Sequence, residues 1–125
     1  MRRSRNTGPD KNTRDLVWAR AGGACEVCST PLHNQIRSLH HRRRRGMGGS
    51  KAPWINSPAN IMLLCGSGTL GCHGRIEHNR AIGYENGWLL RDGQLPADTP
   101  VEITARGRVL LTDDGTYEDA GEVPC

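Results

Sequence analysis

Residues 36–49 read IRSLHHRRRRGMGG, and this stretch decides how the middle of the chain folds. The alternation of apolar and polar residues over 36–41 predicts a short strand that delivers His40 and His41 at its end. Four arginines follow at once, and a loop rich in glycine, serine and proline covers 46–58. Imidazoles bind metals or move protons near neutral pH, arginines bind phosphate, and glycines let a backbone approach a ligand. The combination predicts chemistry on a phosphate group.

The segments on either side predict further short elements. Residues 13–25, TRDLVWARAGGAC, predict a helix over 14–21 with Thr13 as its candidate cap and Gly22-Gly23 as its end. The apolar run NIMLLC at 60–65 predicts a second strand, and a second helix is expected to begin near His73. The predicted fold class is therefore a small α+β domain.

The chain after Tyr84 predicts short strands, with turns at Asp92-Gly93 and Asp114-Gly115. We accordingly expect a basic flexible tail over 1–13, a central domain over 14–83, and a β-rich extension and tail over 84–125. No apolar run approaches the roughly 20 residues of a membrane span, and no apolar stretch follows the basic N-terminus. Neither a signal peptide nor a membrane anchor is predicted.

The composition predicts a small core that needs disulfide bonds or a bound metal to be stable. The chain has 125 residues, no Phe and only five Trp and Tyr together, which limits it to one small core. Five cysteines could supply disulfide bonds or metal ligands. Without a secretion signal we expect a reducing intracellular setting, in which cysteines bind metal more often than they form disulfides.

The cysteines have the spacing of a metal site. Two residues separate Cys25 from Cys28. The second pair, Cys65 and Cys72, begins after a further 36 residues. A structural zinc takes four thiolates in a tetrahedron, and Gly66 and Gly71 would let the wider second loop fold back. The sequence therefore predicts a four-cysteine structural zinc site and leaves Cys125 as a free thiol.

The charge is distributed unevenly. Residues 1–45 hold eleven Lys and Arg against three Asp and Glu, whereas residues 46–125 hold six against ten. Clustered positive charge is the electrostatic footprint of nucleic-acid binding. We expect the DNA backbone to be held by Arg42, Arg43, Arg44 and Arg45, while the N-terminal tail alone would be a solvated segment.

Together, the paired cysteines, LHH at 39–41, SPANIMLLC at 57–65 and GCHG at 71–74 resemble an HNH endonuclease, and more narrowly the small HNH proteins of tailed phages. The resemblance covers about residues 14–80. It implies the ββα-metal fold, also called the His-Me finger, which holds one divalent metal beside one catalytic histidine. Carried over, His41 matches the general base, Asn60 the middle Asn that fixes the His41 region, and His73 the final His, which binds metal.

The rest of the metal site is less closely matched. Many HNH proteins have Asp where this chain has His40, so His40 is expected as a ligand from its position and chemistry. The third ligand is His78, or alternatively Glu77, which shares the helix face of His73 at i+4. Expected catalytic ions are Mn²⁺, Co²⁺, Ni²⁺, Zn²⁺ or Mg²⁺. His33 is expected to be solvated in a turn.

The resemblance implies metal-dependent hydrolysis of DNA phosphodiester bonds, by nicking or double-strand cleavage, in phage genome processing or packaging. By analogy it adds the phage terminase and portal as partners and a cytoplasmic location, that of the host if the chain is phage-encoded. Two alternatives remain: a non-catalytic zinc module that binds DNA or scaffolds an assembly, and a zinc protein whose basic segment binds RNA. The zinc module gives no reason for His40, His41 and Asn60 together, and the lack of a clear aromatic stacking platform in the sequence disfavours the RNA-binding protein.

Overall fold

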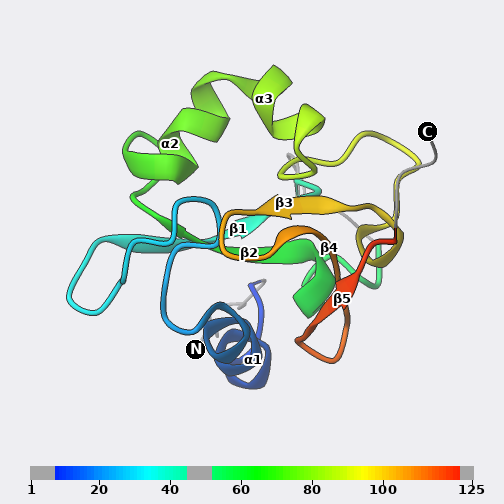
Figure 1. Cartoon of the computed structure of the whole chain (residues 1–125), viewed down its shortest axis with the longest axis horizontal. Helices are drawn as coiled ribbons and strands as arrows, with labels where there is room; N and C mark the ends of the chain where they lie inside the picture. The colour runs from blue at the N-terminus through cyan, green and yellow to red at the C-terminus, as the bar shows by residue number, and fades with distance from the viewer. Residues whose placement is uncertain (1–7, 45–51, 122–125) are drawn as a thin grey trace, which may run out of the picture.

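The computed structural model describes residues 8–44 and 52–121 and shows a small α+β fold with two short antiparallel sheets (Figure 1). In chain order the elements are α1 (Lys11–Ala21), β1 (Arg37–His41), the 3₁₀-helix η1 (Pro58–Asn60), β2 (Ile61–Cys65), α2 (Gly71–His78), α3 (Arg80–Glu85), the 3₁₀-helix η2 (Pro96–Asp98), β3 (Val101–Ile103), β4 (Gly107–Leu111) and β5 (Tyr117–Asp119).

The two predicted central strands form and pair with each other. β1 runs antiparallel to β2, with Arg37 opposite Cys65 and His41 opposite Ile61. The first four residues of β2 are buried, since helices cover both faces of this sheet. Figure 1 shows α1 on one side of β1 and β2, and α2 and α3 on the other. The sheet therefore carries the two histidines between helices that can add further side chains.

α1 begins earlier than predicted. Its N-cap is Asp10, whose carboxylate accepts a hydrogen bond of 2.8 Å from the backbone N–H of Thr13. Thr13, predicted as the cap, instead lies inside the first turn, because the Asp10 carboxylate satisfies one of the free N–H groups there. The predicted end is confirmed: Gly22 caps the helix with a φ of 65°.

The second helical region is divided in two. α2 begins at Gly71, two residues before the predicted start, and ends at His78, with Asn79 as its C-cap. The Asn79 side chain then accepts a hydrogen bond from the N–H of Ile82 and caps α3. The side chains at the start of α2 therefore lie close to the end of β2.

The C-terminal sheet has the order β3-β4-β5 and is antiparallel throughout. The turns at Asp92-Gly93 and Asp114-Gly115 are confirmed. The apolar segment 88–90, predicted as a strand, is instead a buried stretch without regular structure, and the backbone N–H of Leu90 bonds to the carbonyl of Arg42. Burial, not strand pairing, explains its apolar composition.

One hydrophobic cluster joins the central and C-terminal segments. Val17 and Ile61 belong to the same buried cluster as Val101 and Leu111. The predicted regions 14–83 and 84–125 thus share a core. Among the helices of the described residues, none combines the length and the apolar character that crossing a membrane requires.

Candidate functional site

Four cysteines meet where α1, β2 and α2 come together. Cys25 and Cys28 lie in the turns after α1, Cys65 ends β2, and Cys72 lies in the first turn of α2. Their sulfur atoms all lie within 4.8 Å of one another, and the Sγ atoms of Cys28 and Cys65 are 3.7 Å apart. Four thiolates about 2.3 Å from a tetrahedral zinc would be separated by about 3.8 Å. The cluster therefore fits a metal ion.

The loop between Cys65 and Cys72 closes through its glycines, as predicted. Gly66 has a φ of 84°, and a Cβ there would lie 2.0 Å from the carbonyl oxygen of Leu70. The backbone N–H of Cys72 points at Cys65 Sγ, 3.3 Å away, and the N–H of Cys28 at Cys25 Sγ, 3.5 Å away. Such N–H groups stabilise negative charge on sulfur.

The thiols differ in acidity. Burial raises the pKa of Cys25 and of Cys72 above the usual value. Burial alone would also raise the pKa of Cys28, but hydrogen bonds with Thr30 outweigh it and bring that pKa to about 7. Cys28 is also the exposed member of the cluster, whereas Cys25 and Cys72 are buried.

A second group of ligand atoms lies across β1 and α2. His40, His73 and Glu77 each offer one ligand atom, and these atoms lie within 4.8 Å of one another. The two imidazole rings meet edge to face, with centroids 5.2 Å apart. Among the described residues, these and the cysteines form the two groups able to hold a metal.

The hydrogen-bond partner of His40 fixes which of its ring nitrogens carries the lone pair, and both ring nitrogens of His73 have polar neighbours. Nε2 of His40 lies 2.7 Å from the carbonyl oxygen of Trp88, which can only accept, so the lone pair is on Nδ1. The Ser38 hydroxyl lies 3.2 Å from the carbonyl oxygen of Gly66 and 2.7 Å from Nδ1 of His73, whose other nitrogen, Nε2, lies 3.7 Å from Glu77 Oε1. A metal bound at Nε2 would require the proton of His73 to be on Nδ1, where the Ser38 oxygen can accept it.

Both rings are neutral near pH 7. Burial lowers the pKa of His40 to about 4 and also lowers the pKa of His73. Two uncharged imidazoles and one carboxylate thus converge, an arrangement that a bound cation would stabilise. The group fits a divalent metal.

His78 does not join this group. It is exposed at the end of α2, while Glu77 lies one helical turn from His73. The alternative ligand, Glu77, is the one that the helix brings into reach, because a residue at i+5 is rotated about 140° from the shared face. His33 is exposed, as expected, with its ring edge against Trp18.

His41 and Asn60 lie at the ends of β1 and η1, and each has a hydrogen-bond partner close by. Nε2 of His41 lies 2.8 Å from Oδ1 of Asn56. Sequence reasoning did not identify Asn56, because an asparagine in a loop is an ordinary turn residue. The buried Asn60 amide accepts from the N–H of Arg43 and donates to the carbonyl of Ile55, both at 2.8 Å. Asn60 therefore ties the backbone after β1 to the backbone of the segment before η1.

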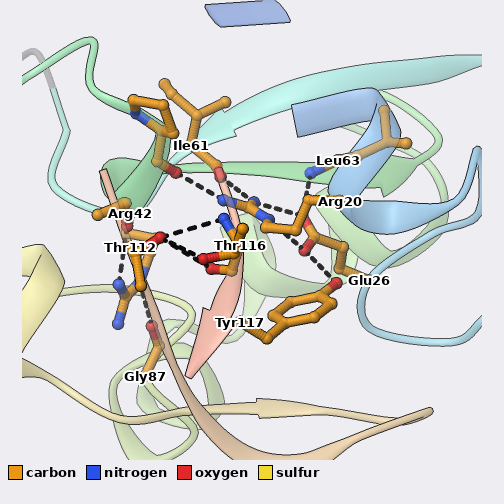
Figure 2. Close-up of polar contacts among 11 residues, drawn as sticks. Arg20, Glu26, Arg42, Ile61, Leu63, Gly87, Thr112, Thr116 and Tyr117 are labelled. Carbon is orange, nitrogen blue, oxygen red and sulfur yellow. Dashed lines mark hydrogen bonds and ion pairs between the residues drawn. The ribbon is translucent and has the colours of Figure 1, made fainter. Parts of the chain in front are cut away.

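The prediction that Arg42 holds DNA is corrected. Its guanidinium is fully buried and donates to four backbone carbonyls, those of Gly87, Ala59, Pro96 and Thr99. Figure 2 shows Arg42 with its bond to Gly87. Burial lowers its pKa to about 9, so the side chain remains charged at neutral pH and acts inside the fold.

Arg43 and Arg44 do face outward. Arg43 forms an ion pair with Asp92, and Arg44 forms one with Glu77 of the metal group. Arg44 thus supplies positive charge at a carboxylate that a metal would otherwise neutralise. Arg45 and Cys125 lie outside the described residues.

Sequence reasoning also missed a buried ion pair. Arg20 and Glu26 are paired through two hydrogen bonds of 3.0 and 2.7 Å with no exposed side-chain area, and Tyr117 donates to Glu26 at 2.6 Å (Figure 2). Arg20 also donates to the carbonyls of Pro58 and Ile61. The pair connects α1, the cysteine turn, β2 and β5, elements far apart in sequence.

No protein-family model, curated protein or solved structure matches this chain. Its function is therefore inferred from the side chains that the fold brings together.

Proposed function

We propose that the protein is a metal-dependent HNH-type endonuclease that hydrolyses DNA phosphodiester bonds. One observation carries the proposal: the ligand atoms of His40, His73 and Glu77 converge within 4.8 Å, and His41 is the next residue after His40 at the end of β1. A cation site next to a hydrogen-bonded imidazole is what phosphodiester hydrolysis needs, because the water must lose a proton while charge builds on the phosphate.

In this proposal, β1, β2 and α2 are the ββα-metal unit. The two antiparallel strands are followed directly by the helix that carries His73 and Glu77, and α2 packs on β2. This arrangement supports the family resemblance of LHH, SPANIMLLC and GCHG.

His41 is the proposed general base. Its Nε2–H donates to Asn56, so in the neutral ring Nδ1 carries the lone pair that takes the proton from water. The oxygen of that water then attacks phosphorus, and the bond from phosphorus to the 3′ oxygen breaks. Asn56 holds the tautomer and Asn60 holds the adjacent backbone.

The other groups bind charge. His40 through Nδ1, His73 through Nε2 and Glu77 would hold the divalent metal, which when bound would supply Lewis-acid stabilisation of the phosphate and of the leaving 3′ oxygen. Arg43 and Arg44 would contact neighbouring phosphates. Arg44 would leave Glu77 when the metal neutralises that carboxylate.

The four-cysteine cluster is proposed to hold zinc as a structural ion. Thiolate ligands favour zinc, and with no water position left in a four-sulfur set the ion would stabilise the fold rather than react. The resemblance extends the proposal to phage genome processing, with terminase and portal as partners.

The test is nicking of a supercoiled plasmid by the full chain, with added Mn²⁺ or Mg²⁺ and in excess chelator. We expect metal-dependent nicking that His41→Ala lowers by about 10²–10⁴-fold, because the proton acceptor is lost. His33→Ala, which removes an exposed histidine away from the site, should retain the rate. DNA binding without cleavage in any ion would instead establish the non-catalytic zinc module, and full activity of His41→Ala would refute the role of His41.

A further inference from the structure

Two arginines are stacked on one tyrosine beside the candidate site. The guanidinium of Arg91 lies 4.4 Å from the centre of the Tyr84 ring, and that of Arg80 lies 5.9 Å from it. Arg80 also donates a hydrogen bond of 3.2 Å to the Tyr84 hydroxyl. We call Arg80, Tyr84 and Arg91 the arginine–tyrosine cluster.

The charge of this cluster is not neutralised within the protein. Arg80 and Arg91 are both exposed, and neither has a carboxylate within 4.0 Å in the part of the chain that the structure describes. Stacking on an aromatic ring restrains a guanidinium while leaving N–H groups at its edge for an external acceptor. The cluster therefore presents two restrained, unpaired cations to solvent.

The cluster is continuous with the candidate site on two sides. Arg80 follows α2, which carries His73 and Glu77, after a single residue. On the other side, the N–H of Leu90 bonds to the carbonyl of Arg42 at 2.9 Å, so the backbone just before Arg91 lies against the residue that follows β1. A strand held at the site would thus meet the cluster next.

Arg43 connects the candidate site to the arginine–tyrosine cluster. It pairs with Asp92, whose side chain is 90% exposed, directly after Arg91. An exposed ion pair of this kind contributes little in water, so Arg43 can exchange Asp92 for a phosphate at small cost. Acidic residues near the cluster include Asp92 and Glu77, both already paired with arginines, Glu85 on α3, and Glu102, which lines a hollow with Tyr84.

We propose that the arginine–tyrosine cluster binds the phosphate backbone of duplex DNA on one side of the cleaved bond. This inference rests on the proposed function for the position of the cleaved bond. Planar guanidinium forks match phosphate oxygens, and contacts of this kind set the position of a duplex without reading its sequence.

The experiment measures binding of a fluorescent 20-base-pair duplex by anisotropy between 50 and 200 mM salt, with the full chain carrying His41→Ala so that no DNA is cut. Each phosphate contact adds about 0.9 to the slope of log Kd against log salt. Adding Arg80→Gln and Arg91→Gln should lower the slope by about 2 and raise Kd at least about tenfold at the lower salt. Each single substitution should lower the slope by about 1.

The matched control removes the same charge on the α1 side of the molecule, through Arg14→Gln and Arg106→Gln. This control pair should change the slope of log Kd against log salt by less than half as much as the Arg80/Arg91 pair does. Tyr84→Ala should weaken binding because it releases both guanidinium groups, whereas Tyr84→Phe keeps the ring and should bind like the parent.

Equal decreases of the slope in the Arg80/Arg91 variant and in the control variant would overturn the proposal, because they would mean that DNA binding depends only on the net charge of the protein. So would an unchanged slope in the Arg80/Arg91 variant, or a parent that does not bind the duplex. The proposed function fails by a different result, the absence of cleavage by the wild-type chain, so the two failures are distinguishable.

Discussion

At the scale of single residues, adjacent and identical side chains have different roles. Arg42 is fully buried on four backbone carbonyls, while Arg43 and Arg44 reach exposed or half-buried carboxylates. The run of four arginines was interpreted as one phosphate-binding surface. The first of them is instead an internal cross-link between the end of β1, η1 and the segment around η2.

Replacing this cross-link should destabilise the fold. Arg42→Met removes the donors of four buried carbonyl bonds, each costing about 1–3 kcal/mol when left unsatisfied, so we expect a loss of about 3 kcal/mol or more in the free energy of unfolding. Urea denaturation measures it. Arg43→Met is the neighbouring control and should change stability by about 0.5 kcal/mol or less; a similarly small effect of Arg42→Met would contradict the structural role.

At the scale of elements, the sequence predicted the parts whose causes are local. The alternation in RSLHH and the apolar run IMLLC each gave the correct strand, and the Cys25/Cys28 and Cys65/Cys72 spacing gave the correct cluster. The start of α1 was wrong because Asp10, outside the periodic segment, supplies the cap. Because Glu77 lies at i+4 from His73 in the predicted helix, the sequence already gave Glu77 as the alternative third metal ligand.

The cysteine cluster should contribute most of the stability of the elements around it. Cys72→Ser should lose tightly bound zinc and most of the cooperative unfolding transition, because metal binding is coupled to folding in a core this small. Elemental analysis and thermal denaturation provide the measurement. His41→Ala should keep its zinc. A folded wild-type protein with four free thiols and no metal would contradict the structural site.

At the scale of the whole molecule, the C-terminal sheet is part of the core rather than an addition to it. Val101, Ile103 and Leu111 are buried with the residues of β2, and Tyr117 donates a hydrogen bond to Glu26 from 91 residues away. Partners this distant explain why the buried Arg20–Glu26 pair could not be predicted. In the sequence Glu26 is simply an acidic residue beside Cys25.

Removing the C-terminal sheet should therefore unfold the central region 14–83. A chain that ends at Pro100 exposes the apolar surface that β3 and β4 cover and leaves the Arg20–Glu26 pair without Tyr117. We expect no cooperative unfolding transition in circular dichroism. The milder Tyr117→Phe should cost about 1.5–3 kcal/mol, the usual contribution of a hydrogen bond to a buried charge. A stable, metal-loaded chain 1–100 would show that residues 14–83 form an independent domain.

The central claim is that His40, His73 and Glu77 hold the ion that drives cleavage. Its most direct test is the Mn²⁺ concentration that gives half-maximal plasmid nicking in wild type, Glu77→Gln and His78→Gln. Loss of a ligand carboxylate should raise that concentration at least about tenfold in Glu77→Gln, whereas His78→Gln, altered at an exposed neighbour on the same helix, should stay within about twofold of wild type. A large increase for His78→Gln together with an unchanged value for Glu77→Gln would contradict the site.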